Sequence, residues 1–154
     1  MKDSAQFCIN VITEYQAPWL LPYSSYELQH ILQEMLLAQA KSGIGSPILG
    51  IDLYLVNDST IRQTNLQFMQ CPGVTNILSF PGGEDLAGSL MLSLDTLERE
   101  SLLYGQPLSA YTLRLLAHGL AHLAQLEHGE EHDKLSYACE TAAKKIIRKF
   151  KSSS

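Results

Sequence analysis

Four of the five histidines in this 154-residue chain lie within residues 115–132, which read LLAHGLAHLAQLEHGEEH. His118 and His122 are four residues apart inside an apolar run. On a helix, residues at this spacing are neighbours on one face, with Cβ atoms about 5–6 Å apart. Two imidazoles placed in this way can bind a single metal ion. The stretch therefore predicts a helix that carries a metal site, and this prediction constrains the rest of the fold.

A third ligand is predicted shortly after this helix. His128 follows His122 by six residues and precedes a glycine, where a helix can end and the chain can turn. Three neutral imidazoles with an open fourth position form a catalytic rather than a structural zinc site. His132 is an alternative third ligand, but it looks like part of the polar run at 130–133, and we favour His128. We expect His118, His122 and His128 to bind one Zn²⁺ and to form the catalytic site.

The residue after the first histidine argues against a peptidase. In H-E-x-x-H metallopeptidases that residue is the general-base glutamate, whereas here it is Gly119. Bound zinc can still lower the pKa of a water molecule to about 7, so other hydrolytic reactions remain open. Glu127, next to His128, is either a residue that orients a ligand or relays a proton, or an exposed turn residue.

Composition sets broad limits on the class of protein. A hydrophobic content of 45% and a charged content of 18% fit a globular protein, and the length predicts a single domain over residues 1–154. The formal net charge of −5 disfavours nucleic-acid binding without excluding it, because charge can be arranged locally. Five of the eleven basic residues lie within 144–154, where they either complement a helix C-terminus or form a phosphate-facing patch.

Three widely spaced cysteines contain no C-x-x-C pair, so we expect buried or half-buried free thiols in a reducing compartment. The sequence has no run of 18 apolar residues and no apolar leader segment near Met1. These features predict a cytoplasmic protein with no membrane segment.

Apolar periodicity predicts the secondary structure. Strands are expected at 6–12, 49–55, 75–80 and 86–92, the last two forming an antiparallel pair. Five helices are expected, one between a capping box of Ser24 with Glu27 and a stop at Gly43, and the others starting after Asn57, at Asp95, at Ser109 and near Lys134. This order predicts an α+β domain with a four-stranded mixed sheet, about five helices and the histidine helix in a central position.

Three stretches carry motifs of a known family. Residues 118–128 resemble H-G-x-L-H-L-x-G-Y-D-H, keeping the three histidines, Gly119 and Leu123. Residues 75–81 (TNILSFP) resemble T-[DN]-V-L-S-F-P, and residues 65–69 (NLQFM) resemble the end of a preceding L-N-x-x-[FY]-R helix. With these motifs in this order, the chain resembles the YbeY family of zinc-dependent endoribonucleases over residues 48–140.

The resemblance implies a zinc-dependent, single-strand-specific endoribonuclease that acts in 16S ribosomal RNA maturation and ribosome quality control, with the small ribosomal subunit and its assembly factors as partners. Asn76 and Ser79 are expected at the end of a strand facing the site, where they either contact substrate or cap and form the turn. The alternative function is a ribosome-associated assembly or binding factor with a metal site and little nuclease activity.

The sequence departs from the family pattern at three places. The family arginine, which is thought to serve substrate binding or catalysis, falls on Met69, and the acid of an L-G-D-[IL] strand falls on Ser89. Gly-Tyr-Asp before the last histidine is replaced by Gln-Leu-Glu at 125–127. A methionine cannot replace a guanidinium. Either another cation reaches the site, with Arg62, Arg99 and Arg114 as candidates, or activity is reduced.

Overall fold

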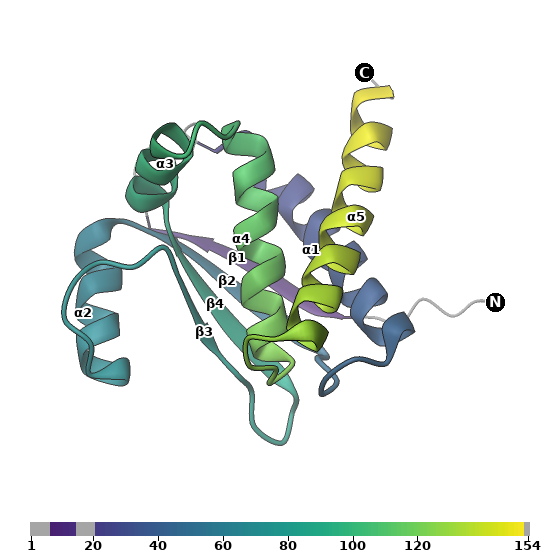
Figure 1. Ribbon diagram of the computed structural model, residues 1–154, viewed down its shortest axis with the longest axis horizontal. Coiled ribbons are helices and arrows are strands. Elements are labelled where there is room, and N and C mark those ends of the chain that lie inside the picture. Colours follow the sequence, from purple (N-terminus) through teal and green to yellow (C-terminus); the bar gives the residue numbers. More distant parts are fainter. Residues whose placement is uncertain (1–6, 15–20, 153–154) are drawn as a thin grey trace.

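A four-stranded mixed sheet forms the centre of the molecule, as expected (Figure 1). The computed structural model describes residues 7–14 and 21–152. The strands are β1 (Cys8–Thr13), β2 (Gly50–Val56), β3 (Ile77–Phe80) and β4 (Ala87–Ser93). Their order across the sheet is β1-β2-β4-β3; β1, β2 and β4 run parallel, and β3 pairs antiparallel with β4. The first residue of the expected strand 6–12, Gln6, lies outside the described residues.

Five helices are present in the described part of the chain. They are α1 (Ser25–Ser42), α2 (Asp58–Met69), α3 (Leu94–Leu103), α4 (Leu108–Leu123) and α5 (Glu130–Ser152). The capping box of Ser24 and Glu27 and the left-handed Gly43 at the end of α1 are confirmed, as is Asn57 as the cap of α2.

Two predicted helix starts were wrong by one or two residues. The cap of α3 is Ser93, whose hydroxyl accepts a hydrogen bond from the Thr96 amide, so α3 begins before Asp95. Helix α4 begins at Leu108, directly after Pro107, and no side chain caps it. Proline suits this place because its fixed φ is compatible with a helix start and its missing N–H would have had no partner.

The start of α5 matters more, because it was predicted near Lys134 and lies at Glu130. Acidic residues in the first turn, Glu130 and Glu131 among them, favour an N-terminus here through the helix dipole. The prediction therefore failed for His132, which lies inside α5 and is buried rather than part of a solvated polar run.

The two faces of the sheet are covered differently. Ile51, Leu53 and Leu55 of β2 belong to the main core, which α1, α4 and α5 close. Residues between them point the other way, and Val56 packs with Ile61 of α2 in a second, smaller core. This division follows from the alternation of side chains along a strand.

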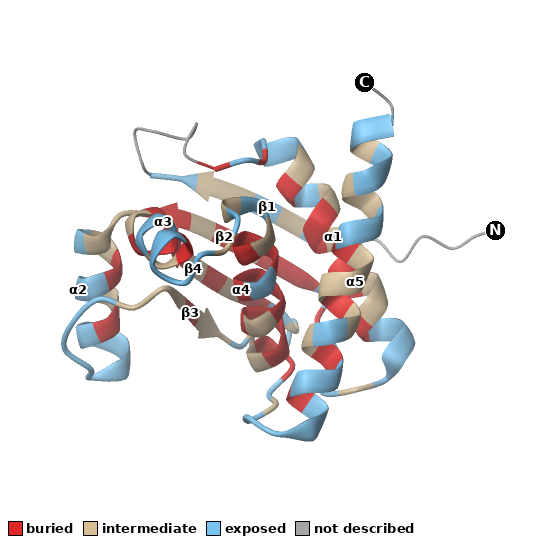
Figure 2. Ribbon diagram, turned by 45° about the horizontal axis from the view of Figure 1, so that its top comes forward, coloured by how far each residue is buried: buried red, intermediate tan, exposed pale blue. Residues whose placement is uncertain are grey.

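Helix α4 lies over the middle of the sheet and is mostly buried (Figure 2). It approaches the sheet closely because Gly119 faces it. A Cβ atom at this position would lie 2.9 Å from the ends of both Ile77 and Leu90. Leu113, Leu116 and Leu120 of this helix are all buried. The glycine of the histidine motif thus allows the close packing of α4 on β3 and β4.

The turn after α4 is held by the backbone. The carbonyl of Ala124 accepts a hydrogen bond of 2.8 Å from the Ser46 amide, in the segment that joins α1 to β2. Gln125 follows with a φ of 63°, in the left-handed region that favours glycine. This residue is where the family motif has glycine, so the backbone conformation explains the motif.

The cysteines are free, as expected, but only Cys139 is buried; Cys8 and Cys71 are exposed, contrary to the prediction. Cys8 starts the edge strand β1, and Cys71 lies in the turn after α2. An edge strand and a turn each have neighbours on fewer sides than a core element, so both side chains stay exposed. Within residues 7–14 and 21–152, no helix is both long and apolar enough to span a bilayer.

Replacement of Gln125 by glycine is expected to stabilise the metal-free protein by about 0.5–1 kcal/mol, because glycine adopts φ near +60° without steric cost. Urea unfolding monitored by circular dichroism measures this change. Gln125→Ala is the matched control and should bring no gain, since alanine keeps the Cβ atom. An equal gain for both variants would show that the side chain, and not the backbone, is the cause.

Candidate metal centre

Four histidines meet where α4 ends and α5 begins. His118, His122, His128 and His132 each offer a ring nitrogen, and these four nitrogens all lie within 4.8 Å of one another. The Nε2 atoms of His118 and His122 are 3.1 Å apart. Nitrogens bound to one tetrahedral zinc ion at about 2.0–2.1 Å would be about 3.4 Å apart. The four donors therefore have the type that a metal ion requires, and the pair on α4 is close to the spacing that one ion imposes.

Each histidine is placed by a different feature of the chain. His118 and His122 lie one turn apart on α4, and His128 lies in the loop that joins α4 to α5. His132 lies in the first turn of α5 and continues the buried stripe of that helix, which includes Leu135 and Cys139. Because α4 packs against α5, this stripe brings His132 to the pair on α4.

His132 is the residue that sequence reasoning undervalued. Its side chain is 2% exposed, and neither ring nitrogen has a hydrogen-bond partner. The nearest carboxylate oxygen, from Asp133, is 3.8 Å from Nδ1, which is too long for a hydrogen bond. An unsatisfied buried polar group costs about 1–3 kcal/mol. A cation at the centre of the cluster would satisfy this nitrogen, so the residues present fit a metal ion.

The cluster keeps its imidazoles in the form that binds metals. Burial and, to a smaller extent, the neighbouring His122, His132 and His128 together lower the pKa of His118 to about 4. Burial also lowers the pKa of His122 and of His132, again with help from the neighbouring histidines. Neutral imidazole is the metal-binding form, and these three rings are neutral at pH 7.

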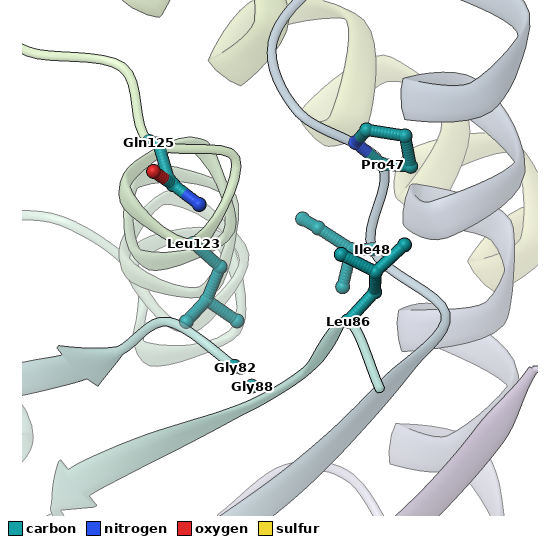
Figure 3. A pocket seen from close by; sticks show the side chains of 7 residues that line it. All are labelled: Pro47, Ile48, Gly82, Leu86, Gly88, Leu123 and Gln125. Atoms are coloured by element: carbon teal, nitrogen blue, oxygen red, sulfur yellow. The ribbon is translucent and has the colours of Figure 1, made fainter. Parts of the chain in front are cut away.

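The cluster opens to solvent along a single stripe of α4. In the part of this helix from Tyr111 onward, only Arg114, His118 and His122 are not buried. A cavity lies beside the end of α4, and no histidine lines it (Figure 3). It has a volume of about 10 Å³, room for about one water molecule, and is lined by Pro47, Ile48, Gly82, Leu86, Gly88, Leu123 and Gln125. Access to the cluster is through the half-buried His118 and His122 and the exposed His128.

The two residues predicted to contact substrate lie at different distances from the cluster. The hydroxyl of Ser79 donates a hydrogen bond of 3.1 Å to the carbonyl of Gly119, so Ser79 adjoins the histidine pair. The amide of Asn76 donates to Glu100, which also accepts a hydrogen bond from Tyr111. Tyr111, which shares Glu100 with Asn76, is seven residues before His118, about 10 Å along the helix. Asn76 is therefore farther from the histidines than Ser79.

Among the three candidate cations, only Arg114 lies on the histidine stripe. It is exposed, one turn before His118, and has no hydrogen-bond or ion-pair partner among the described residues. Arg99 is bound to Asp58 at 2.9 Å and to Thr96 at 3.0 Å. Arg62 is exposed on α2, which covers the opposite face of the sheet. Of the three arginines that the sequence offered as a replacement cation, the structure therefore favours Arg114.

Two departures from the family motifs, Ser89 and Met69, lie away from the histidines, whereas residues 125–127 lie in the loop that carries His128. Ser89 is in register with Asp52 and Phe80, and it points to the face of the sheet opposite α4. Met69 is the last residue of α2. The basic C-terminal residues start twelve positions after His132, about 18 Å further along α5. Glu127 is exposed beside His128. None of these residues belongs to the metal centre.

Comparisons with known proteins agree on one family. The family model described as "Endoribonuclease YbeY" matches residues 19–151. A protein of that name from Lawsonia intracellularis is 50% identical over 117 residues, which are 75% of this chain and 83% of the relative. Its namesake from Nitratidesulfovibrio vulgaris is 36% identical over 150 residues, covering 83% of this chain and 90% of the relative.

A solution structure from Thermotoga maritima has the same fold, with a TM-score of 0.63, 22% identity and 95% of each chain covered. The family match extends over most of the sequence and includes the stretch that carries the four histidines. The chain therefore belongs to the YbeY family of endoribonucleases.

Proposed function

We propose that this protein is a zinc-dependent, single-strand-specific endoribonuclease that acts in the cytoplasm on 16S ribosomal RNA, in its maturation and in ribosome quality control. The observation that carries the proposal is the convergence of four histidine nitrogens within 4.8 Å, in a chain of an endoribonuclease family. The small ribosomal subunit and its assembly factors are the partners that the family resemblance implies.

In this proposal His118, His122 and His128 bind the zinc ion. When bound, zinc supplies a Lewis acid and lowers the pKa of a water molecule to about 7. The histidines contribute neutral donors, because burial keeps His118 and His122 unprotonated near pH 7.

Arg114 is the cation that we propose for contact with substrate phosphate. It lies on the same helical face as His118, with Cβ atoms about 5–6 Å apart, and its guanidinium is free to bind two phosphate oxygens. A guanidinium on α4 would thus make the substrate contact that the family arginine is expected to make and that Met69 cannot make. Contacts of Ser79 and Asn76 with substrate remain part of the proposal, with Ser79 the nearer to the histidines.

Cleavage of RNA tests the function directly. Zinc-loaded protein should cleave a single-stranded fragment of 16S ribosomal RNA, and His118→Ala should reduce the rate by at least about 100-fold through loss of a metal ligand. His30→Ala is the matched control, because His30 packs against Tyr26 and Phe150, outside the cluster. Cleavage by His118→Ala at the wild-type rate would refute the enzyme mechanism, and binding without cleavage by the wild type would support the assembly-factor alternative.

Zinc should stabilise the folded protein in a pH-dependent way. At free zinc about 1000 times Kd, the melting temperature should rise by about 8 °C or more at pH 7, and a chelator should reverse this. The folded-state pKa of His118 lies below its unfolded value of 6.5. Between these values the unfolded chain binds more protons, so the metal-free protein should lose stability as the pH falls from 7 towards 4.

The zinc-induced rise should also shrink towards pH 4, where His118 takes up a proton and ceases to be a ligand. Differential scanning calorimetry with and without chelator at several pH values measures both effects. A melting temperature that does not respond to zinc at pH 7 would count against the metal site.

Arg114→Ala should raise the KM for single-stranded RNA about tenfold, because one charge-assisted contact is lost. It should also reduce the slope of log affinity against log salt by about 0.7, as expected for one phosphate on a single strand. Arg114→Lys should restore the salt slope but not the full affinity. Arg148→Ala, near the far end of α5, is the matched control. An unchanged KM and salt slope for Arg114→Ala would remove this residue from the substrate site.

A further inference from the structure

The four histidines of the cluster are not equivalent. The ring centroids of His118, His122 and His132 are 4.6 Å apart in every pair. The ring of His128 lies further out, 5.3 Å from that of His118, 5.0 Å from that of His122 and 5.2 Å from that of His132. Three rings thus form a compact group, and the fourth is set towards solvent.

The same division appears in the scaffold. The three compact residues lie on α4 and α5, two helices that pack against each other, and His132 is almost fully buried there. His128 is exposed and lies in the loop between these helices. Loops are more mobile than the helices they connect, because fewer packing contacts hold them. A movement of His128 would therefore disturb the fold less than a movement of any of the other three.

The coordination chemistry makes this difference consequential. Zinc in proteins is almost always four-coordinate, and a site that four protein ligands fill is closed to substrate. A hydrolytic zinc site needs one position that water or substrate can occupy. A four-coordinate ion held by four imidazoles opens a position for water most simply by losing one of them, whereas an ion held by three has that position already.

We propose that His132 is a permanent ligand together with His118 and His122, and that His128 is the exchangeable ligand that leaves the ion when substrate arrives. The inference rests on the proposed function, because it concerns the same metal ion. It adds that the resting site is closed by four histidines and that the loop of residues 124–129 controls access. The buried, unpaired nitrogens of His132 and the exposure of His128 carry the assignment.

Metal binding by variants of the full chain tests the permanent ligand. Zinc affinity, measured by competition with a chromophoric chelator, should fall more than about 100-fold in His132→Ala, since even the loss of a group that only orients a ligand costs about 10–100-fold. His128→Ala should lose less affinity than His132→Ala and keep one zinc per chain. Should circular dichroism show that His132→Ala does not fold, His132→Phe fills the same space without a donor nitrogen. His30→Ala should bind zinc like the wild type.

The visible absorption of the cobalt-substituted protein tests the exchange. Added imidazole should shift the Co²⁺ bands of His128→Ala at concentrations that leave the wild type unchanged, because only the variant has an open position. Wild-type zinc affinity in both His132 variants, or an equal or larger loss in His128→Ala, would overturn the assignment. If the wild type cleaves RNA in those circumstances, the proposed function stands and only this inference fails. If the wild type binds no zinc, the proposed function fails as well.

Discussion

The close packing of α4 on the sheet is the constraint on which the rest of the site depends. Gly119 allows this approach, since a Cβ atom there would lie 2.9 Å from Ile77 and from Leu90. The packing buries nearly the whole surface of the helix and leaves one stripe uncovered. Polar residues tolerate only the uncovered positions unless a partner satisfies them, so the chemistry of α4 is confined to Arg114, His118 and His122.

The contact between α4 and α5 then completes the cluster. It places a histidine in the core at a position where an unpartnered imidazole would be unfavourable. Such a residue is tolerated when a ligand compensates its burial, and the three neighbouring imidazoles fit a metal cation as that ligand. Stability and function would be coupled here, because the ion that the proposed reaction needs would also satisfy the buried imidazole of His132.

The departures from the family motifs leave the histidine cluster intact. Two of the three departures, Met69 and Ser89, belong to α2 and to the opposite face of the sheet, and the third, at residues 125–127, lies in the loop before His128. None of the three departures replaces one of the four histidines of the cluster. The proposed use of Arg114 fits this view, because a cation on the exposed stripe needs no help from the other face.

The sequence by itself determined the elements and most of the metal centre. The spacing of His118 and His122, the Ser24 capping box and the alternation in β2 are local patterns, and local patterns fix secondary structure and the faces of helices. Tertiary structure alone decided what depends on residues far apart in the chain. It brought His132 of α5 to the pair on α4, and it separated Arg114 from Arg62 and Arg99. The start of α5 was predicted four residues late, and a shift of about one turn changes which residues a helix buries.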